Sequence, residues 1–245
     1  MAVRVITALV EELDSYTPCI RDPRNLKQNE NYRRFTKHIE QIVKTSQRHH
    51  NQQQHEKVIE SLRFAAKNHA GVFRKDNFTP YFLHPLEVAL ILIDFKIFDF
   101  KLMVAAILHD VVEDTEATFN EIKILFGSGV ECIVRPITKK DTYVFKNLYY
   151  FYTIKSIRNL NTRWRVILLK LADRIHNIMT LDAIESRKDQ LRILHETDVE
   201  FPKLLKVVLF TLTTLWQRRT IKNKHYLHVP HLLFNRLVYE MEAYR

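Results

Sequence analysis

The sequence predicts an all-α protein, and three observations support that fold class. Only 3 Gly and 7 Pro occur in 245 residues, and Gly is thus far below its roughly 7% share in average proteins, which argues against β-sandwiches and barrels. Helical periodicity of apolar residues dominates along the chain. Neither a GxGxxG nor a GxxxxGK[ST] sequence is present, which excludes Rossmann and P-loop nucleotide folds.

The helices can be placed in order from these patterns. The polar run 47–54 suits a loop or an exposed helical turn, and loops are expected at 71–83 and 139–147. In chain order, the predicted helices cover 1–14, 30–48, 56–69, a segment that begins at 84, 100–112, 119–126, 128–138, 148–159, 162–178, 187–200, 203–219 and 229–244.

Local signals mark the ends of several of these helices. Gly71 lies near the carboxyl-terminal cap of the third helix. Pro85 suits the first helical position of the fourth. Thr118 and Glu121 have the spacing of a capping box, and Gly127 ends the short helix that this box opens.

Composition also bears on location. Cys19 and Cys132 are too few for a disulfide framework or a cysteine-rich zinc site. The amino terminus has no long apolar h-region, and no uncharged apolar run reaches roughly 18 residues. We therefore expect a cytoplasmic protein with no membrane partner.

The net charge of +10 is unevenly distributed. Residues 135–170 hold nine Lys and Arg and one acid, whereas residues 59–134 hold seven basic and eleven acidic side chains. A basic stretch next to an acidic one suits a phosphate-rich ligand near a metal-binding carboxylate cluster. A solvated basic helix face is the alternative.

Ionisable residues interrupt the two most apolar helices. His109 and Glu113 are four residues apart, as are Asp110 and Asp114, so all four can line one end of a helix. The second apolar helix presents a similar face, at spacings of three, four and seven residues: Asp173, His176, Asn177 and Thr180.

Acids on two buried helices that face a common space imply a cation between them, because like charges repel. Together with the upstream His84, the set mixes imidazole with carboxylate donors. Such a set favours Mn²⁺, Fe or a Mg²⁺-like ion, allows Zn²⁺ and disfavours a thiolate site. The alternative is that Lys170, Arg174 or the basic stretch pairs with these acids as structural ion pairs.

The pattern His…His-Asp…Asp resembles that of the HD superfamily of metal-dependent phosphohydrolases. The segments FRKDNFTPYFLHP, ILHDVVEDT, EIKILFG and LLKLADRIHNIMTL are similar to the hydrolase domain of RelA/SpoT homologues, which remove the 3′-pyrophosphate of guanosine tetraphosphate and pentaphosphate. The resemblance implies an HD-domain helical bundle over 56–200. Residues 1–55 would be an amino-terminal helical extension, and 201–245 would be carboxyl-terminal helices packed on the same domain.

The resemblance also implies roles for individual residues. The implied metal ligands, for one Mn²⁺ per active site, are His84, His109, Asp110 and Asp173. The implied catalytic pair is Glu113 and Asp114, and the implied substrate-binding residues are Arg74, Lys75, Asn177 and Thr180.

Two positions depart from the family pattern. The family commonly has Gly in the turn after the basic pair, where this chain has residues 76–79, and we expect Asn77 to adopt the left-handed conformation instead. Pro136 replaces a Gly that usually precedes the family's Thr-Lys. Both changes bear on pocket shape and nucleotide preference.

The resemblance implies hydrolysis that yields GDP or GTP and pyrophosphate, with a guanosine polyphosphate as partner. Because only 65 residues follow Thr180, we expect a small alarmone hydrolase without a nucleotidyl-transferase domain. The same site could act as an NADPH 2′-phosphatase or on another nucleotide, or as a non-hydrolysing sensor, although intact Glu113 and Asp114 argue against a sensor. Nucleic-acid binding through 135–170 is an alternative that we do not favour, and an oligomer is left open.

Overall fold

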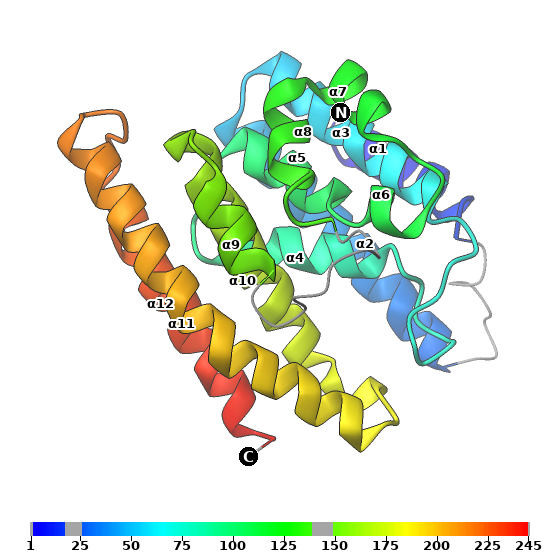
Figure 1. The fold of residues 1–245 in the computed structure, drawn as a ribbon. Helices are drawn as coiled ribbons and strands as arrows, with labels where there is room; N and C mark the ends of the chain where they lie inside the picture. The colour runs from blue at the N-terminus through cyan, green and yellow to red at the C-terminus, as the bar shows by residue number, and fades with distance from the viewer. Residues whose placement is uncertain (1, 18–25, 139–148, 245) are drawn as a thin grey trace. The chain divides into compact units, whose positions relative to one another are not determined.

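The structure is a computed structural model that describes residues 2–17, 26–138 and 149–244 (Figure 1). Every regular element within these ranges is a helix, and the only β pairing in them is an isolated bridge between Phe73 and Pro80. The predicted all-α class is therefore confirmed. The predicted loop 139–147 lies outside the described residues.

The chain divides into two compact units, Met1–Val130 and Glu131–Arg245. In the first unit, α2 packs against α1, α3 and α4, and α5 packs against α3 and α4. Its helices are α1 (Ala2–Asp14), α2 (Leu26–His49), α3 (Gln52–Asn68), α4 (Leu83–Asp94), α5 (Phe100–Leu108), α6 (Val111–Asp114), α7 (Phe119–Phe126) and the start of α8 (Ser128–Val134). Fully buried aliphatic side chains such as Leu62, Leu86 and Ile107 form its core.

The core of the second unit consists of α10, α11 and α12, each of which packs against the other two. The shorter α9 packs against α10 and α11. Figure 1 shows α11 and α12 side by side. The elements are α9 (Tyr149–Ser156), α10 (Leu160–Met179), the 3₁₀ helix η2 (Leu181–Ala183), α11 (Arg187–Gln217) and α12 (His225–Glu242). Most of α10 from Trp164 onward is buried, as its apolar sequence predicts.

Both ends of α7 are capped as predicted, and Gly127 is its carboxyl-terminal cap. Thr118 accepts a hydrogen bond from the Glu121 backbone, and the Glu121 side chain accepts one from the Thr118 backbone, which is the expected capping box of α7. The polar run 47–54 contains a short break between α2 and α3, where Asn51 forms a second capping box with Gln54.

Two predicted helices differ from the structure. The helix expected over 100–112 begins at residue 100 as predicted, but its predicted end is wrong, because α5 ends at Leu108 and a turn at residues 109–110 precedes α6. The Ala106 carbonyl, which would accept the Asp110 N–H in a continuous helix, accepts His109 Nδ1 at 2.8 Å instead. The expected division at residues 201–202 is also wrong: α11 runs through Pro202, since the fully buried Phe201 and Leu204 keep the helix packed across the lost hydrogen bond.

Candidate metal centre

Three of the four predicted metal ligands come together in the first unit. His84 lies in the first turn of α4, and His109 and Asp110 form the turn after α5. The His84 Nε2 atom lies 3.2 Å from Asp110 Oδ2, and the His109 Nε2 atom lies 3.1 Å from the same oxygen. One ligand atom from each residue lies within 4.8 Å of the others, and both histidines are buried.

The protonation of His109 shows why this cluster suits a cation. A backbone carbonyl only accepts hydrogen bonds, so the 2.8 Å contact between His109 Nδ1 and the Ala106 carbonyl places the proton on Nδ1. In the neutral ring, Nε2 then carries a lone pair that points toward a carboxylate oxygen. Two electron-rich atoms at 3.1 Å need a positive charge between them, either a proton or a metal ion. Metal-binding histidines commonly have this backbone hydrogen bond.

The electrostatics of Asp110 agree with a cation site. Burial alone would raise the pKa of this carboxyl, but in their protonated forms His109, through its charge and a hydrogen bond, and His84, through a hydrogen bond, outweigh burial and hold the pKa well below its usual range. Asp110 therefore stays ionised and can serve as a carboxylate ligand. The donor set of two imidazoles and one carboxylate fits a divalent metal ion.

Two residues of this cluster were missed from the sequence. The Tyr81 hydroxyl donates a 2.7 Å hydrogen bond to Asp110 Oδ2, and the Tyr81 ring stands edge-on to His84. The His69 imidazole stacks on the Tyr81 ring with centroids 5.0 Å apart. Tyr81 lies three residues before His84, which was a usable signal, whereas no spacing rule connects His69 to the site.

The predicted basic pair lies in a tight loop between α3 and α4. Arg74 N–H donates to the Thr79 carbonyl at 2.8 Å, and the Asp76 carboxylate accepts hydrogen bonds from the backbone of Phe78 and Thr79. Asn77 has φ 55°, so the predicted left-handed conformation is confirmed. Lys75 is exposed on the same loop.

The predicted catalytic pair lies on α6, directly after the ligand turn. Glu113 and Asp114 are both exposed, and the Asp114 N–H donates to the Asp110 carbonyl at 2.9 Å. Desolvation, aided by the negative charge of Asp110, raises the pKa of the Asp114 carboxyl, although a hydrogen bond with Tyr81 opposes this. An exposed carboxyl with a raised pKa beside a cation site is suited to proton transfer.

The remaining predicted residues lie in the second unit, so their membership of the site stays a prediction. Asp173 on α10 is buried; its Oδ2 accepts from Lys170 Nζ at 2.7 Å and its Oδ1 from Asn177 Nδ2 at 2.6 Å. The Thr180 hydroxyl donates to the His176 carbonyl. The structural ion pair between Lys170 and Asp173, which the sequence offered as the alternative to a metal ligand, is therefore present.

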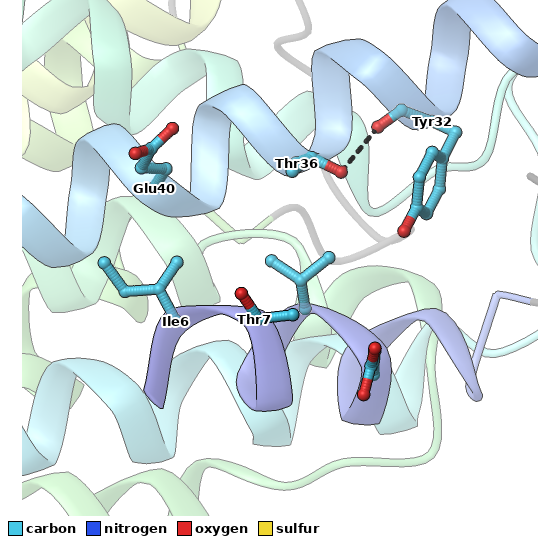
Figure 2. Close-up of a pocket in the computed structure, with 7 residues that line it drawn as sticks. Ile6, Thr7, Tyr32, Thr36 and Glu40 are labelled. Carbon is cyan, nitrogen blue, oxygen red and sulfur yellow. Dashed lines mark hydrogen bonds between the residues drawn. The ribbon is translucent and has the colours of Figure 1, made fainter. Parts of the chain in front are cut away.

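A separate pocket of about 180 Å³ lies between α1 and α2 and involves none of the predicted site residues (Figure 2). Ile6 and Thr7 on α1 face Tyr32, Thr36 and Glu40 on α2.

Among the described residues, no helix combines the length and the apolar character needed to cross a membrane.

Comparisons with known proteins identify a matching family and similar relatives. An HD domain family model matches residues 61–201, more than half of the chain. The chain is 39% identical over 132 residues to the bifunctional (p)ppGpp synthase/hydrolase SpoT of Escherichia coli K12, covering 53% of this chain and 18% of that protein. It is 37% identical over 139 residues to the guanosine-3′,5′-bis(diphosphate) 3′-pyrophosphohydrolase of Aquifex aeolicus, covering 57% and 20%.

A solved structure is similar as well. It is described as a metazoan ortholog of SpoT that hydrolyzes ppGpp and plays a role in starvation responses. The match has a TM-score of 0.54 and 26% identity and covers 74% of this chain and 94% of that one. The chain spans only about a fifth of the length of the curated relatives that it matches.

Proposed function

The chain belongs to the HD domain family, and from this premise we propose that it is a metal-dependent hydrolase that removes the 3′-pyrophosphate of guanosine tetraphosphate and pentaphosphate. One observation carries the proposal: two histidine nitrogens and a carboxylate oxygen converge within 4.8 Å in a chain that is similar to named 3′-pyrophosphohydrolases. The HD domain and the His/Asp cluster imply a divalent ion.

We propose one Mn²⁺ as that ion, held by His84, His109 and Asp110 with Asp173 as a fourth ligand. Imidazole and carboxylate donors suit Mn²⁺. Asp173 would exchange the Lys170 ammonium for the ion, since its Oδ2 now accepts from Lys170. When bound, a divalent ion lowers the pKa of a coordinated water from 15.7 toward about 7 and offsets phosphoryl charge.

Glu113 and Asp114 are proposed to transfer protons during hydrolysis. Hydrolysis adds a water oxygen to the phosphorus bonded to O3′ and breaks the bond between that phosphorus and O3′, which leaves a 3′-hydroxyl and pyrophosphate. The attacking water gives up a proton to one carboxylate, and O3′ takes one up. The position of Asp114 supports this role, because α6 directly follows the turn that holds His109 and Asp110, and the Asp114 side chain is exposed to water and substrate.

Arg74 and Lys75 are proposed to bind the nucleotide, with Asn177 and Thr180 beside the nucleoside. The Arg74 and Lys75 cations lie on the loop that leads to α4, whose first turn holds His84. A planar guanidinium can bind a phosphate with two hydrogen bonds or stack on a base, which an ammonium cannot do.

The proposal is tested by the products. The purified chain, stripped with chelator and reloaded with Mn²⁺, is incubated with guanosine tetraphosphate and, separately, with NADPH, while pyrophosphate and inorganic phosphate are measured. We expect pyrophosphate from the guanosine substrate, its loss in chelator, and no phosphate from NADPH. Phosphate release from NADPH alone would overturn the substrate assignment, and unchanged activity in excess chelator would overturn the metal.

A further inference from the structure

We propose that Tyr81 is a positioning residue that orients the proposed metal ligand Asp110. It also connects Asp110 to the substrate-binding loop, the segment between α3 and α4 that holds Arg74 and Lys75. The proposal rests on the proposed metal site, and it assigns a role to a residue outside the ligand and catalytic sets. Five residues meet at this side chain, and most of them are far apart in the sequence: Asp110, Asp114, His84, His69 and Arg74.

The hydroxyl end of Tyr81 acts on the ligand itself. It donates to Asp110 Oδ2 at 2.7 Å, the same oxygen that lies 3.2 Å from His84 Nε2 and 3.1 Å from His109 Nε2. A carboxylate rotates freely about its last bond unless hydrogen bonds hold it. The Tyr81 donor therefore selects the rotation of Asp110 in which one oxygen faces both imidazoles.

Two contacts hold the ring of Tyr81 in place. The His69 imidazole stacks against it, with centroids 5.0 Å apart and planes 26° apart, and His69 is itself buried. The His84 ring meets it nearly perpendicularly, with centroids 5.8 Å apart and planes 79° apart. A ring held by neighbours on two sides fixes the direction in which its hydroxyl donates.

The backbone of Tyr81 belongs to the substrate-binding loop. Its N–H donates to the Val72 carbonyl at 2.8 Å, and the Phe73–Pro80 bridge closes the same loop. The Arg74 guanidinium carbon lies over the Tyr81 ring, 5.7 Å from its centroid. One side chain thus contacts both a proposed nucleotide-binding cation and a proposed metal ligand.

A substitution can separate the role of the Tyr81 hydroxyl from the role of its ring. Tyr81→Phe removes the hydroxyl but keeps the ring that contacts Arg74, His69 and His84. Hydrogen-bond partners of metal ligands typically contribute 10–100-fold to metal affinity or activity. We expect Tyr81→Phe to weaken Mn²⁺ binding by about 10–100-fold while the KM for guanosine tetraphosphate at saturating Mn²⁺ stays nearly unchanged.

The experiment is titration calorimetry of the chelator-stripped full chain with Mn²⁺ alone, for wild type, Tyr81→Phe and the matched control Tyr32→Phe. Tyr32 lies at the pocket between α1 and α2 (Figure 2), so its hydroxyl should not affect Mn²⁺ affinity. Circular dichroism of the metal-free variants checks that helical content is retained. In the kinetics, excess Mn²⁺ should restore most of the kcat of Tyr81→Phe, because it refills the metal site; the part that is not restored reflects the lost hydrogen bond between Tyr81 and Asp114. A merely structural defect would not respond to Mn²⁺.

The outcomes are distinct from those of the proposed function. Mn²⁺ affinity in Tyr81→Phe equal to wild type would overturn the positioning role, whatever the substrate. An equal loss of affinity in Tyr32→Phe would do the same, because the effect would then be nonspecific. If wild type binds Mn²⁺ and Tyr81→Phe binds it more weakly, but neither hydrolyses guanosine tetraphosphate, the proposed function fails while the positioning role of Tyr81 is supported.

Discussion

Replacing His69 with phenylalanine should stabilise this protein. His69 follows α3 as its carboxyl-terminal cap and is 1% exposed. Among the described residues, neither ring nitrogen of His69 has a hydrogen-bond partner. A phenylalanine ring has nearly the same shape and can keep the stacking on Tyr81 without burying two polar atoms.

The size of the effect follows from the burial. Each unsatisfied buried polar group costs about 1–3 kcal/mol, and the imperfect fit of the larger ring offsets part of the gain, so we expect His69→Phe to raise the free energy of unfolding by about 1–3 kcal/mol near neutral pH. Burial lowers the pKa of His69 to about 4; His109 and His84 add to this, and Asp110 opposes it.

The lowered pKa gives the effect a pH dependence with a definite sign. Between an unfolded pKa of about 6.5 and the folded pKa of about 4, the unfolded chain binds a proton that the folded chain does not. The free energy of unfolding therefore falls as the pH is lowered through this window, by about 3 kcal/mol in total. The His69→Phe variant has no such titrating group, so the difference between its free energy of unfolding and that of wild type should grow toward acid pH.

Urea denaturation in chelator, at about pH 7.5 and about pH 5, measures both effects. His195→Phe is the control, because His195 is exposed on α11 and its replacement relieves no buried polar atom. A His69→Phe chain that is less stable than wild type, or whose advantage is the same at both pH values, would refute the reasoning about buried, unpartnered nitrogens.

Two further predictions concern the site, and a third concerns the contact between α2 and α4. Arg74→Ala should raise the KM for guanosine tetraphosphate at least as much as it lowers kcat if the guanidinium binds substrate as proposed; an unchanged KM would remove Arg74 from the binding site. Glu113→Gln and Asp114→Asn should each lower kcat by about 10²–10⁴-fold with Mn²⁺ content intact, and loss of the metal would show that the pair ligates. Glu87→Gln should lower the free energy of unfolding by up to about 1 kcal/mol in urea denaturation, because the Glu87 carboxylate pairs with the partly exposed Arg34 on α2; an unchanged midpoint would show that this charge contributes nothing.

Much of this arrangement could be predicted because it depends on local chemistry. Helix periodicity gives the fold class, and the Thr118 and Glu121 pair forms the capping box that its spacing predicts. Asn77 adopts a positive φ because its short polar side chain tolerates that conformation where a turn requires it. Adjacent His109 and Asp110 after an apolar helix predicted a cation site, and the structure brings both to His84.

What could not be predicted depends on packing between distant segments. Tyr81 and His69 meet because a loop returns to the end of α3, and no sequence periodicity encodes that return. At the break of the helix after Leu108, the His109 side chain donates to the Ala106 carbonyl, a side-chain hydrogen bond that competes with the backbone and that helical periodicity does not encode. Helical spacing offered the ion pair between Lys170 and Asp173 as an alternative, but it could not decide between that ion pair and a metal ligand.

The central claim is a metal-dependent pyrophosphohydrolase centred on His84, His109 and Asp110, and one titration tests it most directly. Chelator-stripped protein is titrated with Mn²⁺ in the presence of guanosine tetraphosphate, and GDP and pyrophosphate are quantified at each point for wild type and Asp110→Ala. The account predicts equal amounts of the two products, a rate that saturates as a single Mn²⁺ site fills, and no turnover by Asp110→Ala. Turnover that is independent of Mn²⁺, inorganic phosphate in place of pyrophosphate, or full activity of Asp110→Ala would contradict it.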